Sequence, residues 1–332
     1  AGRVDANRGF DPWMTLDRLP HAVLDGVPNV RPLAYRAAML DFAAADAGYR
    51  VAPKEGSGEE GLLISLPLPD GTDATFAIYE TAVMHPDLGK QYPEIKTYSG
   101  SCVSAGVNRG APVALDITPT GLRASIRLPS GVVYIDPASK GDVAHYVSYY
   151  TRDNPGKQRF QCLTEEPGEN HAGGVSQRTS AGTSLRTYRL AMAATGEFTA
   201  ANGGTVSSAL AAITSIVNRM NQVYEVEASV RFQLIATNNL IVWTDAGTDP
   251  YGDPSTIGSA MLTANQTSVG SLIGSANYDI GHVITTNPNF GVLGIAQLSS
   301  VCSTNNKARG ASGIDNSLDN QGVATLVHEV GH

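Results

Sequence analysis

The sequence is poor in cysteine and in charge, and it holds no long apolar run. Three Cys in 332 residues are too few for a disulfide scaffold. Two alternatives stay open for Cys102, Cys162 and Cys302: one disulfide with a third partner elsewhere, or three reduced, buried thiols. No segment approaches the roughly 18 consecutive apolar residues of a transmembrane helix, so we expect no membrane span.

Basic residues are fewer than acidic ones. The 23 Lys and Arg against 31 Asp and Glu give a net charge of -8, which argues against nucleic acid or an anionic membrane as partner. The chain opens with Ala1, without Met and without a basic start followed by an apolar stretch. We therefore expect either that a signal peptide has been removed from a secreted protein or that the polypeptide has been trimmed.

Histidine is also scarce, yet two of the seven His residues lie in a terminal His-Glu-x-x-His motif. On a helix, His328 and His332 lie one turn apart on the same face, so both imidazoles can bind one metal ion. Zinc suits such ligands, and Glu329 stands where the general base of a zinc peptidase stands. The alternative is a chance motif at a helix end, but apolar neighbours such as Leu326 and Val330 favour a buried, metal-bearing helix. A catalytic zinc has three protein ligands, so we expect the third beyond His332.

Alternating apolar residues dominate the first half of the chain. A helix is predicted over 32–47, with Gly48 as its C-cap. A β-hairpin is predicted over 62–79, around a Pro-Asp-Gly turn. Further strands are predicted over 113–117, 122–128, 132–135 and 144–150. Residues 1–163 are therefore interpreted as a mostly β domain with one helix.

From 164 to 184 the composition changes to Gly and small polar residues, which cannot bury enough apolar surface to fold. We predict a linker there, open to proteases, with Arg178-Thr179 as the bond for a trypsin-like enzyme. The elements predicted after it are strands at 185–193, 230–234 and 280–284 and helices at 203–225 and 257–274. This α/β order indicates partly parallel pairing. His282, in the last strand, is interpreted as structural rather than as a ligand.

Several stretches taken together resemble a known family, the secreted bacterial reprolysin-like (adamalysin-type) zinc metallopeptidases, which are metzincins. In the second half they are Leu185-Arg-Thr-Tyr-Arg-Leu-Ala, Thr195-Gly-Glu-Phe-Thr, Asn218-Arg-Met-Asn221, Asn277-Tyr-Asp-Ile-Gly-His282, Gly294-Ile-Ala296, Val301-Cys302 and the terminal motif. In the first half, Tyr92-Pro-Glu-Ile-Lys-Thr-Tyr98 and Val133-Tyr-Ile-Asp-Pro137 are similar to the propeptide of that family. The resemblance covers most of residues 60–332.

The resemblance implies a fold of the α+β or α/β class in three parts. A mostly β propeptide domain (1–163) and an activation linker (164–184) precede the N-terminal part of a metzincin-like catalytic domain (185–332). That domain is expected to hold a twisted mixed sheet, a long backing helix and an active-site helix. By the same resemblance, His328 and His332 bind Zn2+ and Glu329 is the general base of an endopeptidase in zymogen form. In the family motif, the third zinc-binding histidine lies about six residues after the position of His332. The substrates implied by the resemblance are proteins or peptides.

The resemblance also places Gly294 and Ala296 on an edge strand beside the cleft, where a substrate can add as a further strand. The alternative for these two residues is a plain edge turn. The propeptide is expected to pack on the catalytic domain. A zinc-bound thiol from Cys102 or Cys162 is one possible means of latency, although neither lies in the usual switch sequence. Calcium is compatible with the family but unsupported here. The second hypothesis is a truncated or inactive relative that serves as a surface or interaction module.

Overall fold

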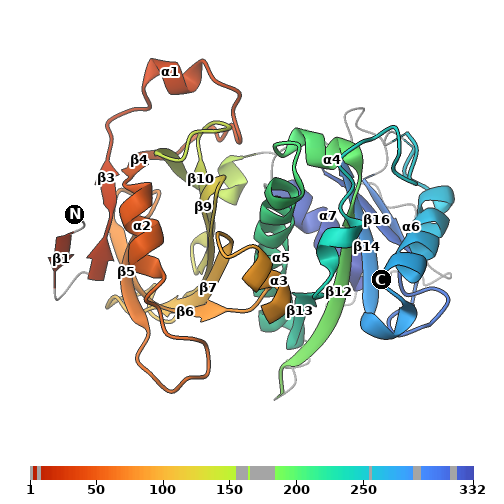
Figure 1. Ribbon diagram of the computed structural model, residues 1–332. Coiled ribbons are helices and arrows are strands. Elements are labelled where there is room, and N and C mark those ends of the chain that lie inside the picture. Colours follow the sequence, from red (N-terminus) through yellow and green to blue (C-terminus); the bar gives the residue numbers. More distant parts are fainter. Residues whose placement is uncertain are drawn as a thin grey trace, which may run out of the picture. The chain divides into compact units, whose positions relative to one another are not determined.

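The computed structural model describes residues 3–5, 9–154, 164, 184–253, 256–286, 293–314 and 320–332. The chain forms two compact units (Figure 1). The first comprises Ala1–Val83 and Gly89–Lys157, and the second comprises Met84–Leu88 and Gln158–His332. The predicted linker at 164–184, including Arg178-Thr179, lies outside the described residues except for Thr164 and Ser184.

The first unit is built on an 11-stranded sheet with the order β1-β2-β5-β6-β7-β8-β9-β10-β11-β4-β3. Its strands are β1 (Arg3–Asp5), β2 (Gly9–Asp11), β3 (Trp13–Thr15), β4 (Arg36–Leu40), β5 (Leu62–Pro67), β6 (Asp73–Thr81), β7 (Lys96–Cys102), β8 (Pro112–Thr118), β9 (Gly121–Leu128), β10 (Gly131–Pro137) and β11 (His145–Tyr150). The helical segments are α1 (His21–Leu24), α2 (Phe42–Tyr49), α3 (Pro86–Gln91) and the 3-10 turn η1 (Thr151–Asp153). The predicted hairpin is confirmed as β5 and β6, and the later predicted strands as β8 to β11.

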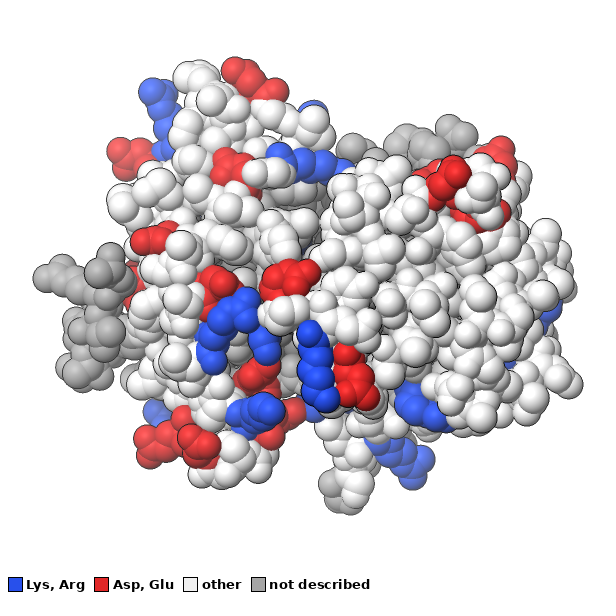
Figure 2. Space-filling view, in the orientation of Figure 1, with Lys and Arg blue, Asp and Glu red and all other residues white. Residues whose placement is uncertain are grey.

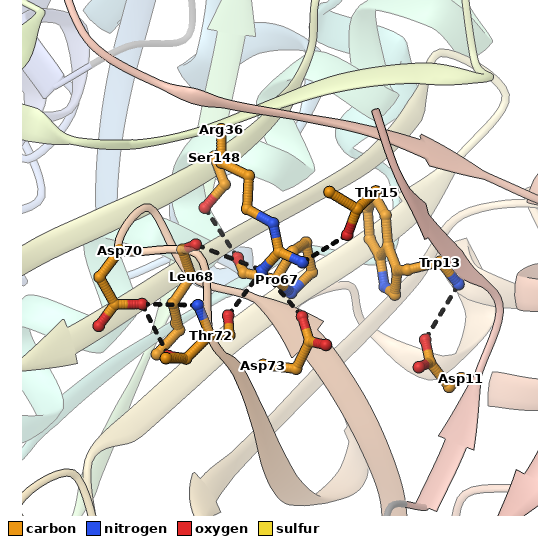
Figure 3. A network of polar contacts seen from close by, with 10 residues as sticks. All are labelled: Asp11, Trp13, Thr15, Arg36, Pro67, Leu68, Asp70, Thr72, Asp73 and Ser148. Atoms are coloured by element: carbon orange, nitrogen blue, oxygen red, sulfur yellow. Dashed lines mark hydrogen bonds and ion pairs between the residues drawn. The ribbon is translucent and has the colours of Figure 1, made fainter. Parts of the chain in front are cut away.

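The two ends of this sheet are joined by one stretch of chain. In β2, Phe10 pairs with Ile64 of β5, whereas β3, which follows directly, pairs with β4 at the other end of the strand order. The side chain of Arg36 on β4 reinforces this closure (Figure 3). It donates to the Thr72 carbonyl at 2.6 Å and to Asp73 Oδ1 at 2.8 Å, both beside the β5–β6 turn. The sheet therefore closes on itself and covers its own edges.

One helix prediction in this unit is wrong. Residues 32–47 form strand β4 and only then helix α2, which begins after Asp41, whose carboxylate accepts from Ala44 N at 3.0 Å. Pairing of β4 with β11 and β3 outweighs the local helix preference. Gly48 lies inside α2 rather than at its C-cap, and an added Cβ there would lie 2.4 Å from Phe10 Cε1. The prediction of a single helix also missed α1 and α3.

The second unit holds a five-stranded mixed sheet in the order β13-β12-β14-β16-β15. Its strands are β12 (Arg186–Ala194), β13 (Val230–Leu234), β14 (Ile280–Thr286), β15 (Gly294–Ala296) and β16 (Gly310–Ile314). All pairings are parallel except that of β15 with β16. The helical segments are α4 (Gly196–Ala201), α5 (Val206–Ala228), α6 (Ser259–Leu272), α7 (Asn320–Gly331), η2 (Asn238–Ile241) and η3 (Ser275–Asn277). The predicted mixed sheet and the long helix are confirmed.

Helix α5 begins with a capping box and is fixed to the sheet by side chains. Thr205 and Ser208 exchange side-chain and backbone hydrogen bonds at the helix N-terminus. The Asn221 amide both donates to the Phe232 carbonyl and accepts from its N–H, each at 2.8 Å. Strand β13 is also contacted by a residue from the first half of the chain: His85 N donates to Leu234 O at 2.8 Å. These contacts hold the strand at this edge of the sheet.

Two surface properties bear on possible partners. None of the helices in the described ranges is long and apolar enough to cross a membrane. On the face drawn in Figure 2, the second unit carries few charged side chains, and over the first unit acidic and basic side chains intermingle. On the described part of that face, the basic side chains therefore do not merge into the single positive field typical of nucleic-acid binding.

Candidate metal centre

Helix α7 carries the His-Glu-x-x-His motif and is held by an apolar face. Val323, Leu326 and Val330 are buried at the spacing of one helix side. The helix packs against α5, β15 and β16. His328 lies on the exposed side, and His332 follows the last helical residue. The sequence thus buries one face of α7 and leaves the two imidazoles at its open side.

The two imidazoles converge on one point. His328 Nε2 and His332 Nε2 are 3.0 Å apart, and their ring planes stand at 88° with centroids 4.6 Å apart. Two nitrogens that share one tetrahedral zinc ion at 2.0–2.1 Å lie about 3.3 Å apart. The pair therefore fits one zinc ion. The described part of the chain holds no group of three His, Cys, Asp or Glu side chains placed to bind a metal.

Glu329 follows His328 directly in α7, and its side chain lies on the buried side of the helix. Its residue exposure is 1%, in contrast to the exposed His328 beside it. Its side chain lies against strand β15, where a Cβ built on Gly294 would come within 2.4 Å of Oε1. The carboxylate is thus held between the active-site helix and the edge of the sheet, next to the imidazole pair.

Strand β15 is the edge strand next to this carboxylate. Gly313 N donates to Leu293 O at 2.7 Å and Gln297 N donates to Arg309 O at 2.8 Å, so these backbone groups face β16. By strand alternation, the backbone groups of Gly294 and Ala296 face away from β16. Among the described strands none pairs with this side of β15, so both predicted substrate-binding residues lie on an edge of the described sheet.

Thr164 contacts that edge with its hydroxyl. Thr164 Oγ1 accepts from Ala296 N at 3.0 Å and donates to Ala296 O at 3.1 Å. One side chain thus uses the two backbone groups that a neighbouring strand would use. The sequence analysis did not single out Thr164, because a threonine at the start of a polar segment carries no signal of a long-range contact.

Tyr224 supports α7 from the long helix α5. Its hydroxyl donates to Val327 O at 2.7 Å. A Cβ added at Gly331 would lie 3.1 Å from the hydroxyl oxygen of Tyr224. Burial raises the pKa of Tyr224 to about 12, so the phenol stays protonated as a donor. Tyr224 lies within the helix predicted over 203–225, but the sequence analysis gave it no role of its own. The polar tip of a buried tyrosine was the available signal.

The other residues considered in the sequence analysis, His282, Cys102 and Cys302, belong to segments other than α7. His282 on β14 is buried, its Nε2 lies 2.8 Å from Ser312 Oγ, and burial lowers its pKa to about 3. It is therefore a neutral core residue bonded to the next strand. Cys102 is buried and Cys302 exposed, both as free thiols. Cys162 lies outside the described residues.

One known family matches the second half of the chain. Residues 184–332 match the model of the metallo-peptidase family M12B, reprolysin-like. No curated protein sequence matches the chain. A similar solved structure is metalloproteinase-II from Bacteroides fragilis, with 12% sequence identity, a TM-score of 0.42, and coverage of 86% of this chain and 85% of that chain.

The second half of the chain therefore resembles a metallopeptidase domain. The reprolysin-like metallopeptidases of family M12B, which residues 184–332 match, depend on zinc and act on proteins or peptides. The His-Glu-x-x-His helix lies within the matched range.

Proposed function

We propose that this chain is the zymogen portion of a secreted zinc endopeptidase. His328 and His332 are two zinc ligands, and a third ligand lies beyond His332. The observation that carries the proposal is the pair of Nε2 atoms 3.0 Å apart on the open side of α7, beside the buried Glu329. Two imidazoles that converge from one helix face suit zinc, and an adjacent carboxylate suits hydrolysis.

Glu329 acts as the general base in this proposal. His328 and His332 would hold a zinc ion, which would supply Lewis-acid activation of the attacking water. The Glu329 carboxylate then accepts a proton from the attacking water. Its burial against β15 limits its motion, so the accepting oxygen stays in one place.

The substrate is an extended peptide that adds to the free edge of β15. The outward N–H and C=O groups of Gly294 and Ala296 provide main-chain hydrogen bonds for such a strand. Because main-chain bonds do not depend on the side chains of the peptide, this edge binds many sequences.

Residues before the catalytic domain keep the enzyme latent. The Thr164 hydroxyl supports this part of the proposal, because it bonds both backbone groups of Ala296 that a substrate strand would need. We propose that residues 1–163 are the propeptide, that they pack on the catalytic domain, and that cleavage within 164–184 removes the block. Latency until cleavage suits a protease that is exported before it acts.

Glu329→Gln in the full-length protein tests the mechanism. We expect activated enzyme with this change to keep its zinc content and to lose peptidase activity by about 100- to 10,000-fold, since the amide cannot accept the proton. Metal analysis and peptide hydrolysis measure the two effects. Near-normal turnover by the variant would disprove the role of Glu329. A wild-type protein without hydrolytic activity after cleavage would favour the alternative, an inactive relative that serves as an interaction module.

A further inference from the structure

Gly294 lies in direct contact with the Glu329 side chain. A Cβ placed on Gly294 would lie 2.3 Å from Glu329 Cγ and 2.4 Å from both Cδ and Oε1. These distances are far shorter than any van der Waals contact between carbon atoms, which is about 3.5–4.0 Å. The carboxylate therefore occupies the space that the side chain of any other residue at position 294 would need.

Backbone conformation does not explain glycine at this position. Gly294 is absent from the described glycines with positive φ, and it pairs in regular antiparallel register with Ser312 of β16. Glycine weakens a strand, because it loses more conformational freedom on folding than other residues. Close approach of another group is the remaining physical reason, and that group is the Glu329 carboxylate.

The contact joins two parts of the site. The backbone groups of Gly294 face the free edge of β15, while its Cα is packed against Glu329. The strand itself is held to β16 on both sides of Gly294, through Leu293 and Gln297. One rigid residue thus fixes the carboxylate relative to the edge along which the peptide lies.

We propose that Gly294 is a positioning residue for the general base, a role that rests on the proposed function of Glu329. A methyl group at position 294 pushes the carboxylate off its place without touching the histidine pair. The atoms that must move are Cγ, Cδ and Oε1 of the buried Glu329 side chain, so the shift also costs stability. A misplacement of about 1 Å costs roughly 100-fold in rate.

The test compares Gly294→Ala with Gly270→Ala in the full-length, activated protein. Gly270 lies in α6, and an added Cβ there meets nothing within 4 Å. We expect Gly294→Ala to lower kcat by about 10- to 100-fold with little change in KM or zinc content, as an interaction lost only in the transition state does. Gly270→Ala should match the wild type. An unchanged kcat for Gly294→Ala overturns the proposal.

A double-mutant cycle on thermal stability tests the contact between Gly294 and Glu329 independently of activity. We expect Gly294→Ala to lower the Tm when Glu329 is present, and to lower it less when Glu329 is replaced by Ala, because the truncated side chain leaves room for the methyl. An equal loss of Tm in both backgrounds overturns the contact. This readout separates the two proposals: a failed cycle removes the positioning role, whereas an active Glu329→Gln variant removes the general base itself.

Discussion

At three positions in the second unit, one polar side chain bonds both the N–H and the carbonyl of a strand residue. The Thr164 hydroxyl bonds both backbone groups of Ala296, and the Asn221 amide does the same for Phe232. The Asn238 amide bonds the N–H and the carbonyl of Met192, each at 2.8 Å. Hydroxyl and amide groups can donate and accept at once, which suits them to cap a strand. Of the three, the Thr164 contact is the one at the edge of the candidate site.

Thr164→Val removes the hydroxyl and keeps the branched shape. We expect the uncleaved variant to hydrolyse a short peptide about 5- to 30-fold faster than the uncleaved wild type. The loss of two hydrogen bonds, at about 0.5–1.5 kcal/mol each, opens the edge of β15. Initial rates on intact zymogen measure this. Thr164→Ser, which retains the hydroxyl, is the control and should behave as wild type. Equal rates for the Val and Ser variants would show that the contact does not contribute to latency.

At the scale of elements, closure of the first unit depends on β4 and its arginine. Arg36 is mostly buried, with a side-chain exposure of 10%, and it bonds groups at the other end of the strand order. Ser148 on β11 adds a bond to the Pro67 carbonyl at 2.8 Å (Figure 3). Because these contacts join strands that are distant in the strand order, they hold the curved sheet closed.

Replacement of Arg36 by Met tests this closure. Met keeps an apolar stem and removes the charged hydrogen bonds, so we expect the first unit to lose about 2–3 kcal/mol of stability. Chemical denaturation of the full chain in a Trp243→Phe background, followed by the fluorescence of Trp13 in β3, measures the effect. Arg18→Met, at an exposed position, is the matched control and should change little. Comparable stability of both variants would mean that backbone pairing alone closes the sheet.

At the scale of the whole molecule, the predicted linker differs in composition from the sequence on either side of it. The segment 164–184 has few apolar residues and no periodic pattern, whereas patterned strands and helices lie before and after it. The first strand of the second unit begins at Arg186. A cut before this residue therefore removes no strand from the second sheet.

Limited trypsin digestion tests this organisation. We expect the first cut at Arg178-Thr179, because protease sites need extended and accessible chain. N-terminal sequencing should find a fragment that starts at Thr179. Arg178→Gln should slow that cut, while the first strands and helices of both units stay intact. An initial cut within β5–β11 or α5, with 164–184 still whole, would contradict the predicted boundary.

Local sequence pattern was enough to predict several elements and the common face of His328 and His332. The spacing of His328 and His332 fixes their common face on any helix, because the helical repeat alone determines it. The apolar stripe of α5 and the alternation of β8 to β11 are likewise properties of neighbouring residues. The hairpin of β5 and β6 follows from its turn residues. These features need no knowledge of the rest of the chain.

Tertiary structure decided what local pattern could not. Residues 36–40 contain good helix formers, yet pairing with β11 and β3 makes them a strand. The contact of Gly294 with Glu329 joins residues 35 positions apart, and that of Thr164 with Ala296 joins residues 132 apart. Such contacts depend on which strand lies at the sheet edge and which helix packs beside it. The sequence therefore specified the chemical groups of the site, and the fold specified which of them meet.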